Sequence, residues 1–167
     1  MNTPKDTSKK FVDIDNSRVD EQRTVMQDIV AADHCPFCLE NLKAYHKEPI
    51  LKEGAHWIVT KNQWPYDHTK VHLLFISRKH ATRLEDLDLA AGAELLELAQ
   101  WAVKEYSIVG GGLVLRFGDT NYSAGTVAHL HAQLLFPDIE APDYDEKPVK
   151  VKIGKMWKDR VAKPDNE

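Results

Sequence analysis

The chain has 167 residues, of which 22 are Lys or Arg and 26 are Asp or Glu, so its formal net charge is −4. This length suffices for one domain with a proper hydrophobic core. The acidic balance argues against an extended nucleic-acid surface and leaves room for a local basic pocket that binds phosphates. No segment has the apolar length of a membrane span, and the polar residues 1–10 lack the hydrophobic core of a signal peptide. We therefore expect a cytoplasmic protein with no membrane partner.

The first third of the chain predicts two helices around a cysteine knuckle. Residues 1–15 are polar and are expected to form a flexible arm. An amphipathic helix is expected over 18–32 and a short helix over 39–45. Between them lies His34-Cys35-Pro36-Phe37-Cys38, which contains the only two cysteines. In a reducing compartment this Cys-x-x-Cys spacing indicates metal or redox chemistry rather than a structural disulfide.

The rest of the chain predicts strands on either side of one long helix. Alternating or continuous apolar runs predict strands at 49–60 (two, around a turn at Glu53-Gly54), 71–76, 113–117 and 129–136. A helix capped by Asp88 is expected to run to about Tyr106, and residues 118–125 read as a loop. This order predicts an α+β domain with an antiparallel sheet. We expect the folded domain to cover 16–137 and a C-terminal extension to cover 138–167.

The most informative stretch is His129-Leu130-His131-Ala132-Gln133, followed by an apolar run. Successive side chains on a strand point to opposite faces, so we expect His129, His131 and Gln133 to share one face. Such a trio can attack an electrophile, bind a metal or hydrogen-bond an anion. The alternative interpretation, a solvated strand face or satisfied core histidines, fits a single histidine better than this set of three.

Residues 35–136 resemble the histidine triad (HIT) superfamily of nucleotide-binding hydrolases and transferases. Three pieces occur in the order found in that family, and they are Cys35-Pro36-Phe37-Cys38, the segment His72 to His80, and the loop Ala124 to Ala128 that precedes His129-Leu130-His131. The resemblance implies a HIT-like antiparallel sheet of about five strands with a long helix packed on it. It also implies a homodimer that takes a nucleotide substrate.

The form His-x-His-x-Gln resembles the transferase branch, which includes galactose-1-phosphate uridylyltransferase and dinucleoside polyphosphate phosphorylases. The resemblance implies that His131 attacks phosphorus and forms a covalent nucleotidyl-histidine. For this chemistry one ring nitrogen must be unprotonated, while an acceptor such as a backbone carbonyl holds the other. Gln133 cannot act as a general acid, but its amide can donate hydrogen bonds to phosphoryl oxygens.

The substrate contacts are less well defined by the sequence. The loop around Gly125 and Thr126 could give backbone N–H groups and a hydroxyl to a phosphate chain. Asn62 is a candidate ribose contact, and Trp64 could cover a nucleobase. Placed without gaps, the loop asparagine and glutamine of the family fall on Gly118 and Gly125, and its ribose-binding acid falls near Trp64, so these contacts differ here.

A structural zinc site is also expected. Such sites take four ligands, of which a Cys-x-x-Cys knuckle supplies two, here Cys35 and Cys38. The resemblance implies that His80 and His129 complete the site, which would give His129 a structural role. The competing interpretation is a thioredoxin-type redox pair, although that motif normally follows a strand and opens a helix in a βαβ unit.

Two other functions remain open at this point. One is a simple nucleotide hydrolase, in which water is the acceptor and Gln133 is a tolerated change. The other is a non-catalytic nucleotide-binding module that has kept the fold and lost its ribose acid.

Overall fold

The computed structural model describes residues 11–156. In this part of the chain the helices are α1 (Asp20–Ala32), α2 (Leu39–Tyr45), α3 (Leu89–Glu105) and α4 (Thr120–Ser123). The strands are β1 (Ile50–Glu53), β2 (Trp57–Lys61), β3 (Thr69–Ser77), β4 (Gly112–Arg116) and β5 (His131–Pro137). Short 3-10 turns occur at Ile14–Asn16 and Leu84–Asp86. No helix in residues 11–156 is both long enough and apolar enough to cross a lipid bilayer.

The strands form one five-stranded sheet in the order β1-β2-β3-β5-β4, and every neighbouring pair is antiparallel. The two central strands are therefore β3 and β5, which pair with Ile76 opposite His131 and Leu74 opposite Gln133. On the outer side of β5, Arg116 of β4 is the partner of His131. The predicted α+β class and the sheet of about five strands are confirmed.

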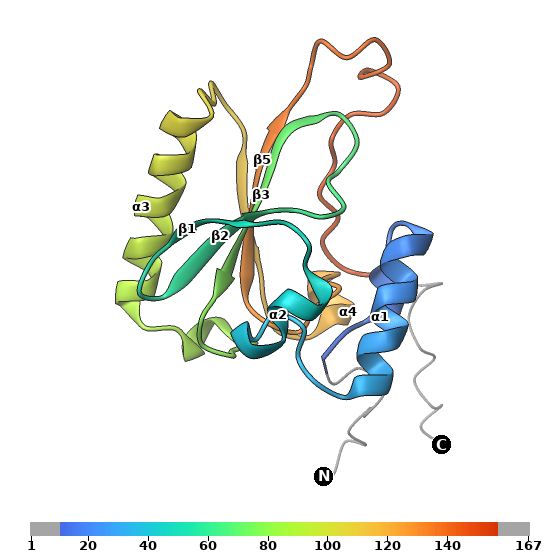
Figure 1. Ribbon diagram of the computed structural model, residues 1–167. Helices are drawn as coiled ribbons and strands as arrows, with labels where there is room; N and C mark the ends of the chain where they lie inside the picture. The colour runs from blue at the N-terminus through green and yellow to red at the C-terminus, as the bar shows by residue number, and fades with distance from the viewer. Residues whose placement is uncertain (1–10, 157–167) are drawn as a thin grey trace, which may run out of the picture.

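Helix α3 covers one face of this sheet (Figure 1). Its apolar side, with Leu95, Leu98 and Ala102, is buried against Trp57 and Phe75. The indole N–H of Trp57 donates to the carbonyl of Ala91 at 2.7 Å, so the largest core side chain is also satisfied as a polar group. Burial of each such apolar side chain contributes about 1.5–3 kcal/mol. The long helix predicted from its apolar stripe is confirmed.

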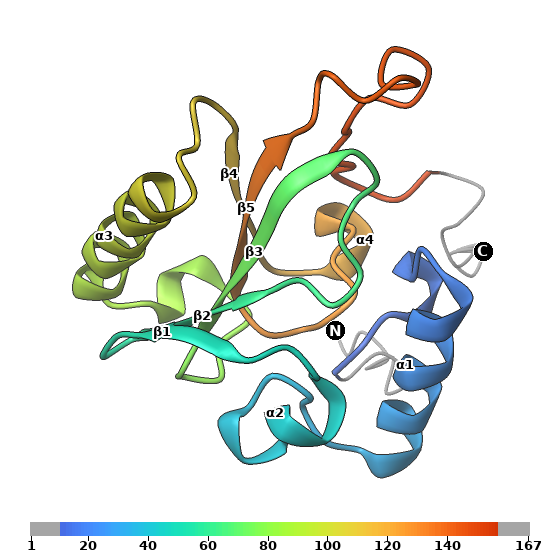
Figure 2. The same cartoon turned by 45° about the horizontal axis from the view of Figure 1, so that its top comes forward.

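Helices α1 and α2 lie on the side of the sheet away from α3 (Figure 2). Leu42 of α2 packs on Ile58, Leu74 and Ile76, which point to the opposite face from Phe75. Strand β3 is apolar on both faces because helices cover both, and this explains its continuous hydrophobic run. Helix α1 buries Met26 and Ile29 in a separate apolar cluster.

The expected flexible arm over 1–15 is wrong for residues 11–15, which pack on the domain. Val12 is 2% exposed and forms an isolated antiparallel bridge with Val127. The backbone N–H of Asp13 donates to the carbonyl of Thr126 at 2.7 Å. Burial of Val12 and the backbone contacts with Val127 and Thr126 thus hold residues 11–15, although the polar composition of 1–15 had suggested a flexible arm. Residues 1–10 lie outside the described part of the chain.

Two further expectations are corrected between β4 and β5. The predicted loop over 118–125 contains the short helix α4, whose N-cap Asp119 accepts a hydrogen bond from the N–H of Asn121 at 2.7 Å. The predicted strand from His129 begins only at His131. The backbone of Leu130 instead bonds to Ala81 and Ser77, which turns the chain before it enters the sheet.

Candidate active site and metal cluster

A cavity of about 510 Å³ lies over the sheet face opposite α3. His131 and Gln133 reach it from β5, and Arg116 reaches it from β4. The remaining walls come from α1, the loop around 62–67, the turn at 124–127 and the C-terminal segment 147–152. The cavity thus joins the centre of the sheet to segments that are far apart in the sequence, and it is the candidate substrate site.

His131 is held in one tautomer. Its Nδ1 lies 2.7 Å from the carbonyl oxygen of His129, so Nδ1–H donates and Nε2 is the unprotonated nitrogen of the neutral ring. The ring is 8% exposed, and the edge of Phe37 packs against it at a centroid distance of 5.0 Å. Burial, with a smaller contribution from the charge of Arg116, lowers the pKa of His131 to about 4. This is the arrangement that a nitrogen nucleophile needs.

Gln133 is oriented by a buried histidine. The backbone N–H of Tyr66 donates to Nδ1 of His72 at 3.0 Å, so the single proton of neutral His72 is on Nε2. Nε2 lies 3.0 Å from Oε1 of Gln133 and donates to it. Burial lowers the pKa of His72 to about 4, which keeps the ring neutral. The amide nitrogen of Gln133 therefore points away from His72 and remains available as a donor.

Of the three residues predicted to contact the substrate, two line the cavity and one lies outside its lining. Asn62 lines the cavity, and its Nδ2 lies 3.0 Å from Nε2 of His72, while its Oδ1 accepts from the N–H of Trp64 at 2.9 Å. Thr126 also lines the cavity, and its hydroxyl donates to the carbonyl of Asn16 at 3.2 Å. Gly125 lies outside this lining, and its N–H donates to Oγ of Ser123 at 3.2 Å. Their roles toward a nucleotide stay predictions.

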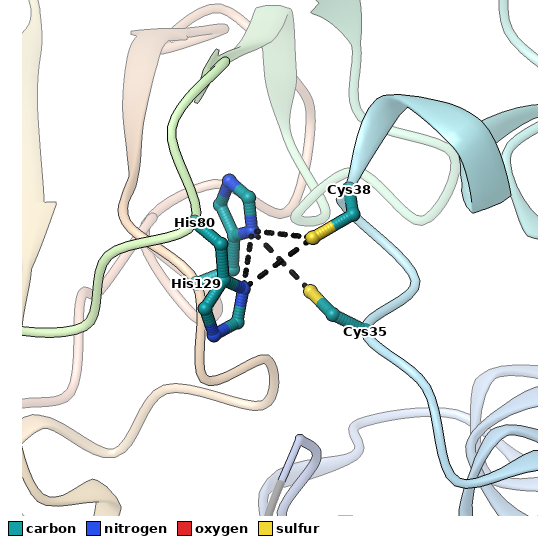
Figure 3. A group of neighbouring side chains, drawn as sticks. All are labelled: Cys35, Cys38, His80 and His129. Atoms are coloured by element: carbon teal, nitrogen blue, oxygen red, sulfur yellow. Dashed lines mark hydrogen bonds between the residues drawn. The ribbon is translucent and has the colours of Figure 1, made fainter.

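The four predicted metal ligands do come together (Figure 3). One ligand atom from each of Cys35, Cys38, His80 and His129 lies within 4.8 Å of all the others. Nδ1 of His129 is 3.3 Å from the Cys35 sulfur and 3.3 Å from Nδ1 of His80. The Cys38 sulfur is 3.4 Å from Nδ1 of His80 and 3.9 Å from Nδ1 of His129. These four residues could hold a metal ion.

His129 differs from His131 in what it faces. Its Nε2–H donates to the carbonyl of Ser77 at 2.6 Å, which leaves Nδ1 unprotonated toward the two sulfurs. A backbone partner on the far nitrogen is the usual way to orient a metal-binding histidine. The expectation that His129 shares one strand face with His131 and Gln133 is therefore wrong, because β5 begins two residues later. The ring of His129 belongs to the four-residue cluster that could hold a metal ion, and its backbone carbonyl accepts the hydrogen bond from His131.

None of the basic residues of the cavity was predicted from the sequence as a site residue. Arg18, Arg116, Lys147, Lys150 and Lys152 line it, together with two carboxylates, Asp15 and Asp67. Arg116 could have been noticed as the one charged residue in the apolar run 113–117. Its position beside His131, however, depends on the register of β4 against β5, which no local pattern in the sequence specifies.

Comparison with known proteins supports the fold assignment. No family model matches the chain, and no curated protein matches it. Among solved structures, the histidine triad nucleotide-binding protein from Candida albicans aligns with 68% of this chain and 89% of its own, at 20% identity and a TM-score of 0.52. A hypothetical protein from Leishmania major aligns with 78% of this chain and 86% of its own, at 21% identity and a TM-score of 0.54. The chain has the histidine triad fold.

Proposed function

We propose that this protein is a nucleotidyl transferase or phosphorylase that acts on nucleotide phosphoanhydrides through a covalent intermediate on His131. The observation that carries the proposal is the 2.7 Å hydrogen bond from Nδ1 of His131 to the carbonyl of His129, at the wall of a cation-lined cavity. This bond leaves Nε2 with a lone pair for attack, whatever substrate is bound. The histidine triad fold supports the choice of a nucleotide as ligand.

The proposed reaction has two displacements at phosphorus. Nε2 of His131 attacks the phosphorus, an N–P bond forms, and the P–O bond to the leaving phosphate breaks, with the electron pair leaving on oxygen. The ring then carries a positive charge, which its Nδ1–H shares with the carbonyl of His129. In the second displacement an acceptor oxygen attacks the same phosphorus, and the N–P bond breaks with its electron pair returning to Nε2.

Gln133 assists both displacements as a hydrogen-bond donor. Its Oε1 accepts from His72, so the amide N–H groups are the part that can meet phosphoryl oxygens. An amide does not titrate in the working range and gives no proton to a leaving group. We therefore expect substrates whose leaving group is already stable as an anion, and an acceptor such as inorganic phosphate or a sugar phosphate rather than water.

We further propose that the metal cluster holds structural zinc. Tetrahedral zinc with standard bond lengths places two nitrogen ligands about 3.4 Å apart and a nitrogen and a sulfur about 3.6 Å apart. The observed 3.3 Å between the Nδ1 atoms of His80 and His129, and the nitrogen–sulfur distances of 3.3, 3.4 and 3.9 Å, fit these values. Two thiols and two imidazoles are also a common structural zinc set. Zinc would tie the knuckle to the chain ahead of β5, and no chemical step uses it.

The alternative redox function of the knuckle has less support. Cys38 directly precedes α2, but α1 rather than a strand comes before the knuckle, and each thiol faces an imidazole.

The predicted homodimer also stays a proposal. Light scattering of the purified protein would test it directly.

The deciding experiment is product analysis with a diadenosine polyphosphate, with and without inorganic phosphate. Three proteins are compared, namely the wild type, His131→Ala and the control His56→Ala, whose ring lies outside the cavity. Products that incorporate added phosphate, and that vanish only in His131→Ala, support the transferase. AMP regardless of phosphate identifies a hydrolase. Turnover at the wild-type rate in His131→Ala refutes the proposed nucleophile, and binding without turnover in all three proteins identifies a non-catalytic module.

A further inference from the structure

The C-terminal segment 147–152 forms one wall of the candidate active site. After β5 the chain turns back and runs past the loop around 62–67 toward α1 (Figures 1 and 2). Three lysines of this segment, Lys147, Lys150 and Lys152, are among the residues that line the cavity. Their side chains are exposed, so they meet the cavity from its open side. A stretch that lies beyond the folded core in sequence is thus part of the substrate site.

The cavity has the opposite charge to the rest of the molecule. Five of its lining residues are basic and two are acidic, whereas the whole chain has a net charge of −4. A concave site with one dominant sign of charge concentrates the electrostatic field and attracts ligands of the other sign. The ligand of this cavity should therefore be an anion with more than one charge.

Two arginines connect this charge to the nucleophile. Arg116 is the β4 partner of His131, and its guanidinium donates to the hydroxyl of Tyr66 at 3.2 Å and to the carbonyl of Lys152 at 3.0 Å. The guanidinium of Arg18 lies over the ring of the same tyrosine, 4.2 Å from its centroid. Arg116 is thus both the strand neighbour of His131 and a direct hydrogen-bond partner of the C-terminal segment.

A buried ion pair fixes the position of this segment. Nζ of Lys155 lies 2.6 Å from Oδ2 of Asp13, and both side chains are 1% exposed. The same carboxylate oxygen accepts from the hydroxyl of Thr120 at 2.6 Å, and the N–H of Lys155 donates to the carbonyl of Asn121 at 2.8 Å. A buried charge pair with this many partners is a specific attachment. The lysines ahead of it are consequently presented to the cavity in a defined place.

We propose that Arg116, Lys147 and Lys150, which line the same cavity, form an anion subsite for the phosphate groups that follow the attacked phosphorus. Lys150 has no carboxylate partner among residues 11–156, whereas Lys147 lies 3.6 Å from Asp143. The substrate class is then nucleoside polyphosphates, in which a phosphate chain leaves, rather than nucleoside monophosphates joined to a neutral group. This inference rests on the proposed function, because that function identifies which phosphorus His131 attacks.

The test is equilibrium binding of AMP and ATP by calorimetry, in a His131→Ala background that prevents turnover. We expect ATP to bind more tightly than AMP. Adding Lys150→Ala should weaken ATP about threefold to fivefold, as for an exposed charge contact, and leave AMP unchanged. Adding Arg116→Gln should weaken ATP more. Lys104→Ala, an exposed lysine on α3, is the matched control and should change neither ligand.

The outcomes separate this subsite from the catalytic proposal. Equal affinity for ATP with and without Lys150, or equal losses for AMP and ATP, would overturn the subsite even if the wild type turns over nucleotides. A selective loss of ATP in Lys150→Ala would support the subsite even if His131 proved dispensable for turnover. Thermal unfolding of each variant confirms that it is folded, and raised salt should reduce the ATP preference, since screening acts on exposed charges.

Discussion

His72 donates a hydrogen bond from Nε2 to Oε1 of Gln133 across 3.0 Å, between the two central strands of the sheet. The donor role is settled by the backbone N–H of Tyr66, which occupies Nδ1 of the same ring. A glutamine amide can otherwise turn over and exchange its oxygen and nitrogen. Here the pair selects one orientation, in which the N–H groups of Gln133 face the side where a phosphate would bind.

Replacing His72 by Phe should therefore impair catalysis without removing a group that touches substrate. We expect kcat to fall about tenfold with little change in KM, because one hydrogen bond of about 1.4 kcal/mol no longer orients Gln133. His72→Gln offers an N–H to the same oxygen and should recover part of the loss. Steady-state kinetics of both variants tests this, and a wild-type kcat in His72→Phe would contradict it.

The buried His72 should also make stability depend on pH. Burial lowers the pKa of His72 to about 4 in the folded protein, against about 6.5 in an unfolded chain. Between these values the unfolded state binds the proton and the folded state does not, so stability is lost as the pH falls from about 6.5 to about 4. His72 alone should contribute about 1–2 kcal/mol to the loss of stability between pH 7 and pH 5, and His131, whose pKa is lowered in the same way, adds to that loss. Urea unfolding at both values should therefore show a loss in His72→Phe that is about 1–2 kcal/mol smaller than the loss in the wild type.

Removing one of the four proposed metal ligands should abolish metal binding. We expect one metal ion per chain in the wild type and close to none in Cys35→Ser. The melting temperature should fall by about 5–10 °C, because a structural metal contributes its binding energy to folding. His34→Ala is the matched control, since this neighbour bonds to Tyr45 outside the cluster. Elemental analysis with thermal unfolding decides the matter, and a metal-free wild type that melts like Cys35→Ser would refute a metal site.

The buried pair of Lys155 and Asp13 should be costly to break from one side. Lys155→Met removes the ammonium that lies 2.6 Å from the buried carboxylate of Asp13, and we expect a loss of about 3–5 kcal/mol in the free energy of unfolding. The double variant with Asp13→Asn should recover part of this, because the amide oxygen can still accept from Thr120. Denaturant unfolding of the two variants measures both effects. A loss below about 1 kcal/mol in Lys155→Met would mean that the segment is only loosely attached.

The sequence predicted most of the elements because their signals are local. The apolar stripe of α3 and the double-sided apolar run of β3 each reflect what packs on them. The spacing of Cys35 and Cys38 indicated metal or redox chemistry, and the family resemblance added His80 and His129, which the structure brings together with the two cysteines. The attacking role of His131 also came from the resemblance and stays a prediction, although its tautomer meets the physical requirement stated for it.

What escaped prediction depends on contacts between distant segments. Arg116 lies beside His131 because of a strand register, and Lys155 is buried because Asp13 is there to meet it. A lysine in a polar C-terminal segment is normally solvated, so nothing in the local sequence indicated the burial of Lys155. His129 was placed on the wrong face because the sequence alternation continues past the true start of β5.

His129 belongs to two sites, since its ring faces the thiols while its carbonyl accepts from His131. Zinc is invisible to optical spectroscopy, but cobalt in a tetrahedral site of thiols and imidazoles absorbs in the visible range. A cobalt-loaded preparation would therefore carry a chromophore connected to the nucleophile through a single residue. Occupancy of His131, by a ligand or by a covalently bound nucleotidyl group, should then be readable as a colour change at a position that does not touch the ligand.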